Sequence, residues 1–526
     1  MSQSVFTQSD IQHFTLHGLT EDQIQAQFKI LKNDIPHVNI NRPCTIGDGI
    51  MTLDPSTIDK LETKYVKTLS TRQTIKFVPA SGAASRMFHA LMSTYNRRRQ
   101  YSTTTDDASH NQDYIQSREC LNAISDFAFA EDLTSILLKH GLHLNTLVKH
   151  KRYNEILEYL LMPKGLNYAH QPKALIPFHR YTDHCRTPLA EHLVEAIEYT
   201  CNTRNIASLH FTVSLDHEKA ISAYVTEMKS RYARNGVTFN ISYSQQKLST
   251  NTITIDENNQ PFRDNTGVLV LRQSGHGSLI ENLNNLQEDI CFIKNIDNVV
   301  PDRLKYETYR YKKALGGLLV SVQEKVFSFL KQLDSGPVEE PVLIHMVKWR
   351  QQTFSLTVPD EFANQSNSER VTFLHHQFNR PLRICGMVRK TKEFGGGPFW
   401  VQHNDRTQSI QIVEDAQINT KLANQQTVFK SSTHFNPVDI VCGLRDYHGN
   451  SFDLRKFVDP HTSIMTRKFY EGRTLRILEH PGLWNGSMAY WNTIFVEVPS
   501  LTFNPVKTIL DLLRPEHQYR PVHLQN

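Results

Sequence analysis

Buried strands and amphipathic helices alternate along the middle of this chain. Strands are predicted where apolar and β-branched residues cluster, at 75–78, 209–215, 237–243, 268–271 and 290–293. Between them, Thr187 and Pro188 form an N-cap and a first-turn proline, and a further helix is predicted at 216–232. This spacing is typical of βαβ units. It predicts an α/β fold with a doubly wound, mostly parallel sheet and a ligand at the carboxyl edge of its strands.

Further patterns flank this core. Helices are predicted at 7–35, 55–70, 117–162 and 303–333, and strands at 342–347, 382–388, 410–414, 438–441 and 494–498. Residues 101–113 are polar and predict a surface loop, and residues 395–398 predict a loop between strands. We therefore expect three regions: an N-terminal helical buttress at 1–70, an α/β core at 71–340 with a helical insertion at about 90–165, and a strand-rich part at 341–526.

A run of small residues follows the first predicted strand. Residues 80–85 read Ala-Ser-Gly-Ala-Ala-Ser, and apolar residues at helical spacing come directly afterwards. Small residues between a strand and a helix let backbone N–H groups approach an anion closely. Arg86 follows at once and can clamp a phosphate with two hydrogen bonds. The alternatives are a tight packing turn and, for Arg86, an ion pair with a surface acid.

Composition narrows the class of protein. The chain has 526 residues, of which 39% are hydrophobic and 21% charged, as in ordinary folded proteins. Its formal charge of +5 is too small to indicate nucleic-acid binding and suits a small anionic substrate. The seven cysteines form no Cys-x-x-Cys pair, no window approaches 18 apolar residues, and the first residues lack the pattern of a signal peptide. We expect a cytoplasmic protein with reduced thiols and no membrane contact.

Short motifs then occur in a characteristic order. Residues 81–86 (Ser-Gly-Ala-Ala-Ser-Arg) are followed by 172–177 (Pro-Lys-Ala-Leu-Ile-Pro), by Gln245 after a strand and by 275–277 (Gly-His-Gly). Residues 295–298 (Asn-Ile-Asp-Asn), 411–417 (Gln-Ile-Val-Glu-Asp-Ala-Gln) and 498–513 (Val-Pro-Ser-Leu-Thr-Phe-Asn-Pro-Val-Lys, ending in Asp-Leu-Leu) complete the series. This order resembles the UTP–sugar-1-phosphate uridylyltransferases, the UDP-glucose and UDP-N-acetylhexosamine pyrophosphorylase group of the nucleotide-diphospho-sugar transferases. The chain as a whole also resembles an uncharacterised bacterial domain family.

The chain departs from the pyrophosphorylase pattern at three places. Ser81 and Ala84 stand where the family's loop has glycine, which limits how closely the backbone approaches phosphate. Ser278 follows the Gly-His-Gly motif where the family often has Asp. The insertion between Arg86 and Lys173 is also longer than in the relatives.

The resemblance implies a Mg²⁺-dependent reaction of a nucleoside triphosphate, with UTP favoured, and a sugar 1-phosphate. In that reaction an already ionised phosphate oxygen attacks, so the site needs cations and N–H donors and no general base. The catalytic residues implied are Arg86, Lys173 and Lys507, with Asp297 as the metal ligand. The nucleotide-binding residues implied are Ser81, Gly82, Ala83, Ala84, Ser85, Gln245, Gly275, His276 and Gly277, and the sugar-binding residues are Glu414 and Asn298.

Each of these residues also has a plainer explanation. Asp297 can cap a turn, His276 can be a structural hydrogen-bonding residue, and Glu414 can be solvated at a strand end. For the whole chain, the main alternative is a non-catalytic nucleotide or nucleotide-sugar binding protein on the same scaffold. A glycosyltransferase ranks last, because residues 295–297 lack a second acid for an Asp-x-Asp metal site.

Overall fold

The computed structural model describes residues 5–33, 37–100, 112–233, 236–391, 396–470 and 472–519, with only the backbone for residues 98–100. Most of the polar stretch 101–113, and Gly395 of the predicted loop at 395–398, lie outside these residues. The chain divides into two compact units. Unit 1 comprises Met1–Thr74, Gln246–Ile293 and Tyr311–Pro499, and unit 2 comprises Ile75–Gln245, Lys294–Arg310 and Ser500–Asn526. The sequence-based region boundaries at 70 and 340 stay predictions.

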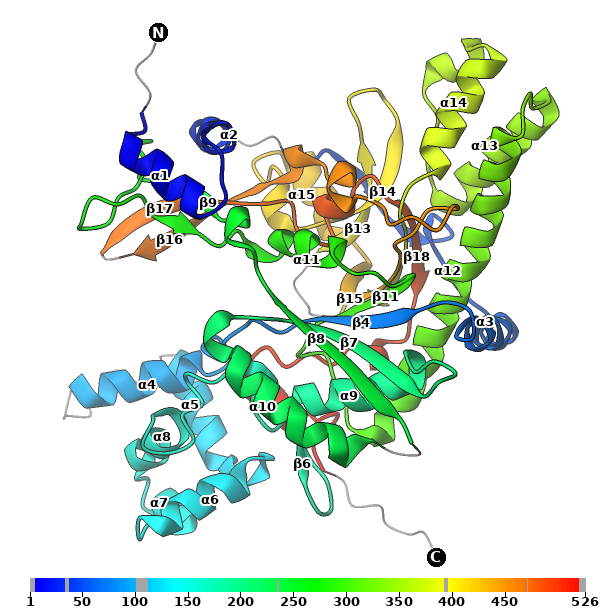
Figure 1. The fold of residues 1–526 in the computed structure, drawn as a ribbon. Coiled ribbons are helices and arrows are strands. Elements are labelled where there is room, and N and C mark those ends of the chain that lie inside the picture. The colour runs from blue at the N-terminus through cyan, green and yellow to red at the C-terminus, as the bar shows by residue number, and fades with distance from the viewer. Residues whose placement is uncertain are drawn as a thin grey trace, which may run out of the picture. The chain divides into compact units, whose positions relative to one another are not determined.

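Unit 2 is built around parallel strands (Figure 1). β4 (Thr74–Pro79) pairs in parallel with β7 (Ile206–Val213), which pairs in parallel with β8 (Thr238–Gln245). Helices α9 (Pro188–Tyr199) and α10 (Leu215–Tyr232) cover these strands, and their apolar faces share one buried cluster with them. α9 begins as its sequence predicts, because the Thr187 side chain accepts the N–H of Ala190 at 3.2 Å and Pro188 occupies the first turn.

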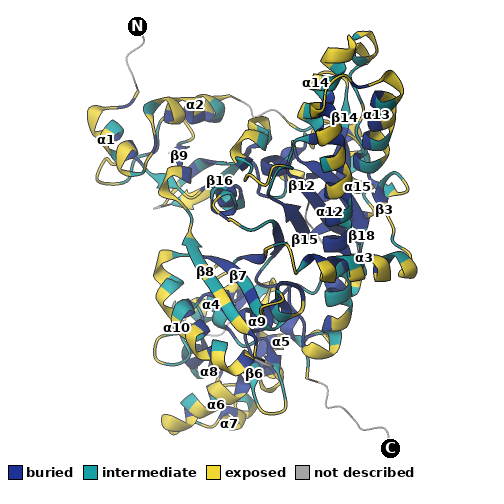
Figure 2. Cartoon of the chain, turned by 45° about the vertical axis from the view of Figure 1, so that its right-hand side comes forward, coloured by how far each residue is buried: buried dark blue, intermediate teal, exposed yellow. Residues whose placement is uncertain are grey.

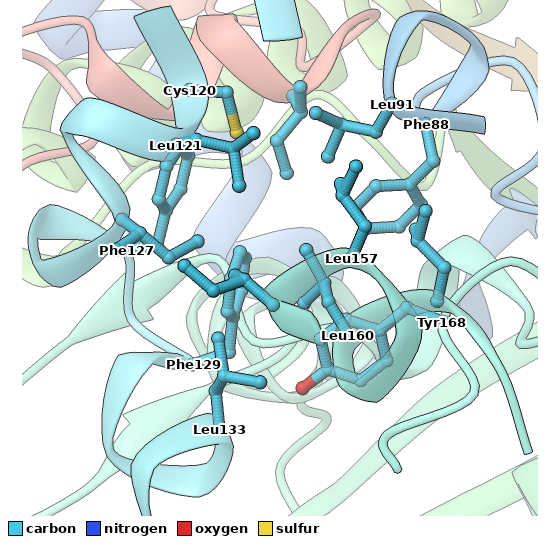
Figure 3. Packing of buried hydrophobic residues seen from close by; sticks show 14 of the residues in the cluster. Phe88, Leu91, Cys120, Leu121, Phe127, Phe129, Leu133, Leu157, Leu160 and Tyr168 are labelled. Atoms are coloured by element: carbon cyan, nitrogen blue, oxygen red, sulfur yellow. The ribbon is translucent and has the colours of Figure 1, made fainter. Parts of the chain in front are cut away.

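A layer of helices extends unit 2 between β4 and α9. Its elements are α4 (His89–Gln100), α5 (Gln112–Asn122), α6 (Ala130–Lys139), α7 (Leu144–Lys149) and α8 (Tyr153–Leu161). Figure 3 shows their core, in which Phe88, Leu121, Phe129 and Leu160 point toward one another. The same cluster includes Val506, Ile509 and Leu512 from the end of the chain. The C-terminal segment is therefore an integral part of this layer.

Unit 1 contains most of the remaining strands. Its largest sheet has the order β2-β3-β18-β12-β15-β11. The pairs β2–β3, β3–β18 and β18–β12 are parallel, whereas β12 and β15 are antiparallel. Figure 2 shows β12, β15 and β18 as buried strands. Two smaller antiparallel sheets have the orders β1-β13-β14 and β10-β9-β17-β16. The strands are β1 (Ile40–Pro43), β2 (Thr45–Ile46), β3 (Gly49–Met51), β9 (Thr252–Ile255), β10 (Leu271–Arg272), β11 (Ile290–Lys294), β12 (Leu382–Arg389), β13 (Gly397–Gln402), β14 (Gln408–Val413), β15 (His434–Gly443), β16 (Ile464–Tyr470), β17 (Arg473–Glu479) and β18 (Asn492–Glu497).

Eight helices accompany these sheets in the described residues. They are α1 (Gln8–Leu16), α2 (Glu21–Lys32), α3 (Pro55–Thr68), α11 (Ile280–Asn284), α12 (Lys305–Asp334), α13 (Glu340–Phe354), α14 (Asn367–Phe378) and α15 (Ala423–Lys430). Among them, α1, α2, α3 and α12 coincide with predicted helices. The fold is thus α/β with mostly parallel central strands and a strand-rich C-terminal part, which confirms the predicted class.

Three local predictions are wrong. Residues 342–347 lie inside the helix α13 and not in a strand, since Leu343, Met346 and Phe354 are buried at helical spacing and a proline occupies the first turn. Of residues 268–271 only Leu271 belongs to a strand, β10, which is antiparallel to β9 and outside the parallel series. Within the predicted loop at 395–398, Gly397 and Pro398 already pair with β14.

Two further properties follow from the described residues. All seven cysteines are free thiols. No helix in the described parts of the chain is long and apolar enough to cross a membrane.

Candidate functional site

Asp297 lies in the turn after β11, and two lysines from distant parts of the chain converge on its carboxylate. Lys173 Nζ donates to Oδ2 at 2.8 Å, and Lys507 Nζ donates to Oδ1 at 3.2 Å and to Oδ2 at 3.0 Å. The side chains of Asp297 and Lys173 are 9% and 12% exposed, whereas that of Lys507 is 59% exposed. All three residues belong to unit 2. We call these three residues the lysine–aspartate cluster.

Burial and charge act together in this cluster. Burial lowers the pKa of the Lys173 ammonium below its ordinary value, although Asp297 beside it favours the charged form. Burial also opposes ionisation of Asp297, but the two ammonium groups outweigh it and hold the pKa of this carboxyl below its ordinary value. With two lysines and one aspartate the formal charge of the cluster is +1, and Lys507 is its exposed member. An excess cation beside open solvent suits a phosphate oxygen.

The C-terminal segment is fastened to the Asp297 turn by backbone contacts. The N–H of Val506 donates to the Asp297 carbonyl at 3.1 Å, and the N–H of Asn504 donates to the Asn298 side chain at 2.9 Å. Asp511 accepts the backbone N–H groups of Lys507 and Thr508 at 2.8 and 2.7 Å. Asp511 thus positions Lys507. Sequence reasoning left it out of the site, although the Thr-x-x-Asp spacing at 508–511 is a recognisable capping signal.

A second, fully buried charge cluster supports the strand that leads to Asp297. Glu195 of α9 accepts from Lys76 Nζ of β4 at 2.8 Å and from Lys294 Nζ of β11 at 2.9 and 3.0 Å. Next to it, His192 Nε2 lies 3.2 Å from the carbonyl oxygen of Ile296, inside the Asp297 turn. α9 therefore fixes this turn from within the fold. Sequence reasoning missed this cluster, since Lys76 and Lys294 sit in apolar strands and no local signal marks them.

The small-residue loop lies against the segment that carries Lys173. The N–H of Ala84 donates to the Gln171 carbonyl at 3.1 Å, and the N–H of Lys173 donates to the Gly82 carbonyl at 3.3 Å. Ser81, Gly82, Ala83 and Ser85 are exposed, and Ala84 is buried. A Cβ atom on Gly82 would meet nothing within 4 Å, so this glycine is not required by packing.

The predicted order of strand, loop and helix is confirmed, but the helix begins later than the apolar spacing from Met87 predicts. Residues 84–88 form turns, and α4 begins only at His89. The loop therefore lacks the immediate helix N-terminus that the sequence suggested. Arg86 is exposed within these turns, and no hydrogen bond or ion pair of its guanidinium occurs among the described residues. Its expected alternative partner, a surface acid, is not seen there.

Gln245 ends β8 with an exposed side chain. Its Nε2 donates to Glu218 Oε2 at 2.5 Å. Asn298 is buried, its Nδ2 donates to the Thr502 carbonyl at 3.4 Å, and its Oδ1 accepts from Asn504. The contacts of Asn298 hold the turn together, and its predicted sugar contact stays a prediction.

The Gly-His-Gly motif and Glu414 belong to unit 1. His276 Nδ1 accepts the N–H of Leu483 at 2.9 Å, its ring stacks on Trp484 with centroids 4.1 Å apart, and its Nε2 lies 3.7 Å from Glu414 Oε1. Burial opposes ionisation of Glu414, but His276 counteracts it and the pKa of this carboxyl falls below its ordinary value. The structure thus brings His276 and Glu414 together.

The local structure requires a glycine at both positions of this motif. Gly275 has a φ of +68°, in the left-handed region that favours glycine. A Cβ atom on Gly277 would lie 2.2 Å from the Pro481 carbonyl oxygen. The predicted nucleotide contacts of Gly275, His276 and Gly277 stay predictions.

The described residues offer few protein ligands for the expected magnesium ion. Among the described residues no group of three or more His, Cys, Asp or Glu side chains is arranged to hold a metal. Asp297 offers one carboxylate. Since Mg²⁺ is commonly bound by one or two carboxylates together with substrate phosphates and waters, a single Asp beside a phosphate site fits that ion as one of its ligands.

Residues 7–518 match the family described as "Domain of unknown function (DUF4301)". No curated protein matches the chain. Among solved structures it is similar to a mutant UDP-glucose pyrophosphorylase from Leishmania major in complex with UDP-glucose, with 11% identity, 98% of this chain and 79% of that chain covered, and a TM-score of 0.43. It is also similar to UDP-glucose phosphorylase from Trypanosoma brucei, with 12% identity, 97% of this chain and 80% of that chain covered, and a TM-score of 0.44. A third similar structure is uridine diphosphate N-acetylglucosamine pyrophosphorylase from Trypanosoma brucei in complex with inhibitor, with 11% identity, 93% of this chain and 74% of that chain covered, and a TM-score of 0.47.

Proposed function

We propose that this chain, which belongs to the family described as Domain of unknown function (DUF4301), is a nucleotidyltransferase that joins a nucleoside triphosphate to a sugar 1-phosphate and releases pyrophosphate. The observation that carries the proposal is the lysine–aspartate cluster. Lys173, Asp297 and Lys507 are far apart in the sequence, the motif resemblance singles out each of them, and they meet through direct ion pairs. UTP is the favoured triphosphate, on the resemblance of Gln245.

The reaction needs charge neutralisation above all. An ionised oxygen of the sugar phosphate attacks the α-phosphorus, the bond to the bridging oxygen breaks, and pyrophosphate leaves with the electron pair. Lys173 and Lys507 would bind non-bridging oxygens as point charges and hold the two polyanions in line. The mostly buried position of Lys173 strengthens its interaction with a developing charge, since water screens it poorly there.

The small-residue loop would bind the triphosphate end. Backbone N–H groups of Ser81, Gly82, Ala83 and Ser85 are at an exposed surface, Ala84 anchors the loop, and Arg86 follows them. A guanidinium suits two oxygens of the β- and γ-phosphates. The open space at Gly82 supports this role over that of a packing turn.

We propose Mg²⁺ as the cofactor, with Asp297 as its protein ligand. The ion would neutralise charge on the substrate phosphates. Lys507 is the exposed partner of Asp297, so it can exchange the carboxylate for a phosphate oxygen without uncovering a buried charge. The nucleoside roles of Gln245, Gly275, His276 and Gly277 and the sugar roles of Glu414 and Asn298 rest on the motif resemblance alone.

A second candidate is a non-catalytic nucleotide or nucleotide-sugar binding protein. It is favoured by the state of Asp297, whose two oxygens already accept from two lysines, so the carboxylate has its counter-charges without a metal. Ser81 and Ala84, in place of loop glycines, point the same way.

Pyrophosphate release separates the two candidates. Purified protein with Mg²⁺ is assayed with each nucleoside triphosphate against a panel of sugar 1-phosphates, beside the variants Lys507→Gln and Lys219→Gln. Lys219 is an exposed residue of α10 and serves as a matched control. Release that needs one sugar phosphate and is lost in Lys507→Gln alone supports the enzyme. No release, with UTP still raising the melting temperature of the wild type, supports the binding protein, and no response to either contradicts both.

A further inference from the structure

Unit 1 contains a cavity built from none of the residues discussed so far as phosphate ligands. Its volume is about 770 Å³, within the range of small-molecule sites. Its walls come from α13, α14, β13, β14 and the segment before β18. Figure 2 shows α13, α14 and β14 beside one another. Every residue of the lining belongs to unit 1.

Arg350 of α13 is a buried member of this wall. Only 3% of the residue is exposed. One nitrogen, Nη2, donates to Gln377 Oε1 at 2.6 Å, and the guanidinium lies 5.9 Å from the ring centroid of Phe373. Nε and Nη1 are buried and have no hydrogen-bond partner among the described residues. Such atoms are rare in folded proteins and call for an explanation.

Two more arginines lie in the same region without a carboxylate. Arg380, which also lines the cavity, donates from Nε to the His376 carbonyl at 3.1 Å and from Nη1 to the Tyr490 carbonyl at 3.4 Å. Arg383 is fully buried, donates to Trp484 and Thr493, and its Nη2 has no partner among the described residues. Within the described parts of the chain none of Arg350, Arg380 and Arg383 forms an ion pair.

The guanidinium of Arg350 is nevertheless charged at neutral pH. Burial, together with repulsion from nearby Arg380, lowers its pKa to about 9, which is still above neutrality. Burying a charge without a counter-ion is costly, and folded proteins normally pair it. The excess positive charge in this wall therefore lacks a partner within the described part of unit 1.

The carboxylates of the cavity do not supply that partner. Asp405 accepts from the backbone N–H and the hydroxyl of Thr407 at 3.0 and 2.6 Å. Asp459 accepts the N–H of His461 at 3.0 Å. Both side chains are engaged in their own turns, and neither forms an ion pair with Arg350 or Arg380.

We propose that this cavity binds a small molecule whose phosphate or carboxylate group is held by Arg350 and Arg380. The anionic group supplies the missing counter-charge, and the guanidinium geometry suits two oxygens of such a group. The apolar and amide side chains around them, such as Phe354, Leu356 and Gln411, accommodate the remainder of the ligand. This inference does not rest on the proposed nucleotidyltransferase activity.

The test uses the full chain in a buffer without phosphate or carboxylates. Inorganic phosphate and citrate are titrated separately, at constant ionic strength, by thermal shift and calorimetry. We expect at least one of them to raise the melting temperature, and the Kd to increase at least tenfold in Arg350→Met. Arg467→Gln, which removes an exposed arginine of β16, should bind like the wild type. Without anion, Arg350→Met should melt no lower than the wild type, because it loses an uncompensated charge.

Several outcomes overturn the proposal. These are no response of the wild type to either anion, an equal response to chloride, and unchanged binding in Arg350→Met. Loss of binding in Lys507→Gln instead would assign the anion to the lysine–aspartate cluster. If Arg350→Met does not fold, the half-buried Arg380→Gln takes its place with the same expectation. The anion that binds more tightly identifies the phosphate or the carboxylate as the recognised group.

Discussion

Asp297 forms two ion pairs that differ in their exposure to water. Its ion pair with Lys173 is nearly buried, whereas its ion pair with Lys507 is open to water. A buried charge that loses its partner is costly, but an exposed pair contributes little to stability. The two lysines can therefore be distinguished by experiment.

We predict that Asp297→Asn and Lys507→Gln differ in stability and agree in activity. Asp297→Asn leaves Lys173 buried without its carboxylate, which should lower the free energy of unfolding by about 3 kcal/mol. Lys507→Gln should cost less than about 1 kcal/mol. On the proposed function, both should reduce pyrophosphate release by on the order of 10²-fold or more, since each would remove a charge near the phosphates. Urea denaturation and the release assay measure the two effects, and equal stability losses would contradict the assignment.

We predict that His210 of β7 makes the protein less stable in mild acid. Its ring nitrogens contact the hydroxyls of Ser242 and Ser244 at 2.8 and 2.7 Å, and burial lowers the pKa of His210 to about 4. In the unfolded chain a histidine has a pKa of about 6.5, so the unfolded state binds more protons between the two values. Stability attributable to this residue is present above a pH of about 6.5 and falls as the pH is lowered toward about 4.

The expected loss of stability on acidification follows from the difference in proton binding between the folded and unfolded states. Lowering the pH from about 7 to about 5 should cost about 2 kcal/mol through His210 alone. His210→Gln should show a correspondingly smaller loss over that interval. Urea unfolding at both pH values measures this, and an unaltered pH dependence in His210→Gln would disprove it.

At the scale of elements, α9 is the helix that supports the Asp297 turn of unit 2. It presents Glu191 and Glu195 on its buried face, each to cations from other segments. Glu191 accepts from Lys305 and Arg186, and Glu195 from Lys76 and Lys294. Glu198 lies on the exposed side of the same helix. One helix thus offers a buried and an exposed carboxylate for comparison.

We predict that Glu195→Gln lowers the free energy of unfolding by about 3–5 kcal/mol, because two wholly buried lysines lose their carboxylate. Glu198→Gln should stay within about 0.5 kcal/mol of the wild type. Chemical denaturation gives both values. An equally small change in both variants would mean that the charges of Lys76 and Lys294 are balanced by groups other than Glu195.

Elements were predictable where two local signals agreed. Thr187 and Pro188 mark the start of α9, and the turn after β11 places Asp297 at a strand end. The strand predicted at 342–347 was wrong because a six-residue segment with five apolar side chains suits a buried strand as well as a helix. Only contacts with other elements decide between the two. The motif order found Lys173, Asp297 and Lys507. Arg350 carried no signal, since nothing local says whether an arginine will be paired.

At the scale of the whole molecule, neither unit is a continuous stretch of chain. Unit 2 takes its last segment from residue 500 onward, after the chain has completed unit 1. That segment delivers Lys507 to the lysine–aspartate cluster and three apolar side chains to the helical core. A boundary drawn along the sequence therefore cuts through a folded unit.

We predict that deleting residues 500–526 unfolds the helical layer of unit 2, whereas deleting 520–526 does not. Val506, Ile509 and Leu512 are each at most 2% exposed, and fully burying such a side chain stabilises a protein by roughly 1.5–3 kcal/mol. Their joint loss, on the order of 5 kcal/mol, is comparable to the whole stability of many domains. Limited proteolysis should cut the shorter chain within residues 112–161 while the chain ending at Tyr519 stays resistant there. Resistance in both would mean that the helical layer holds together without its C-terminal contacts.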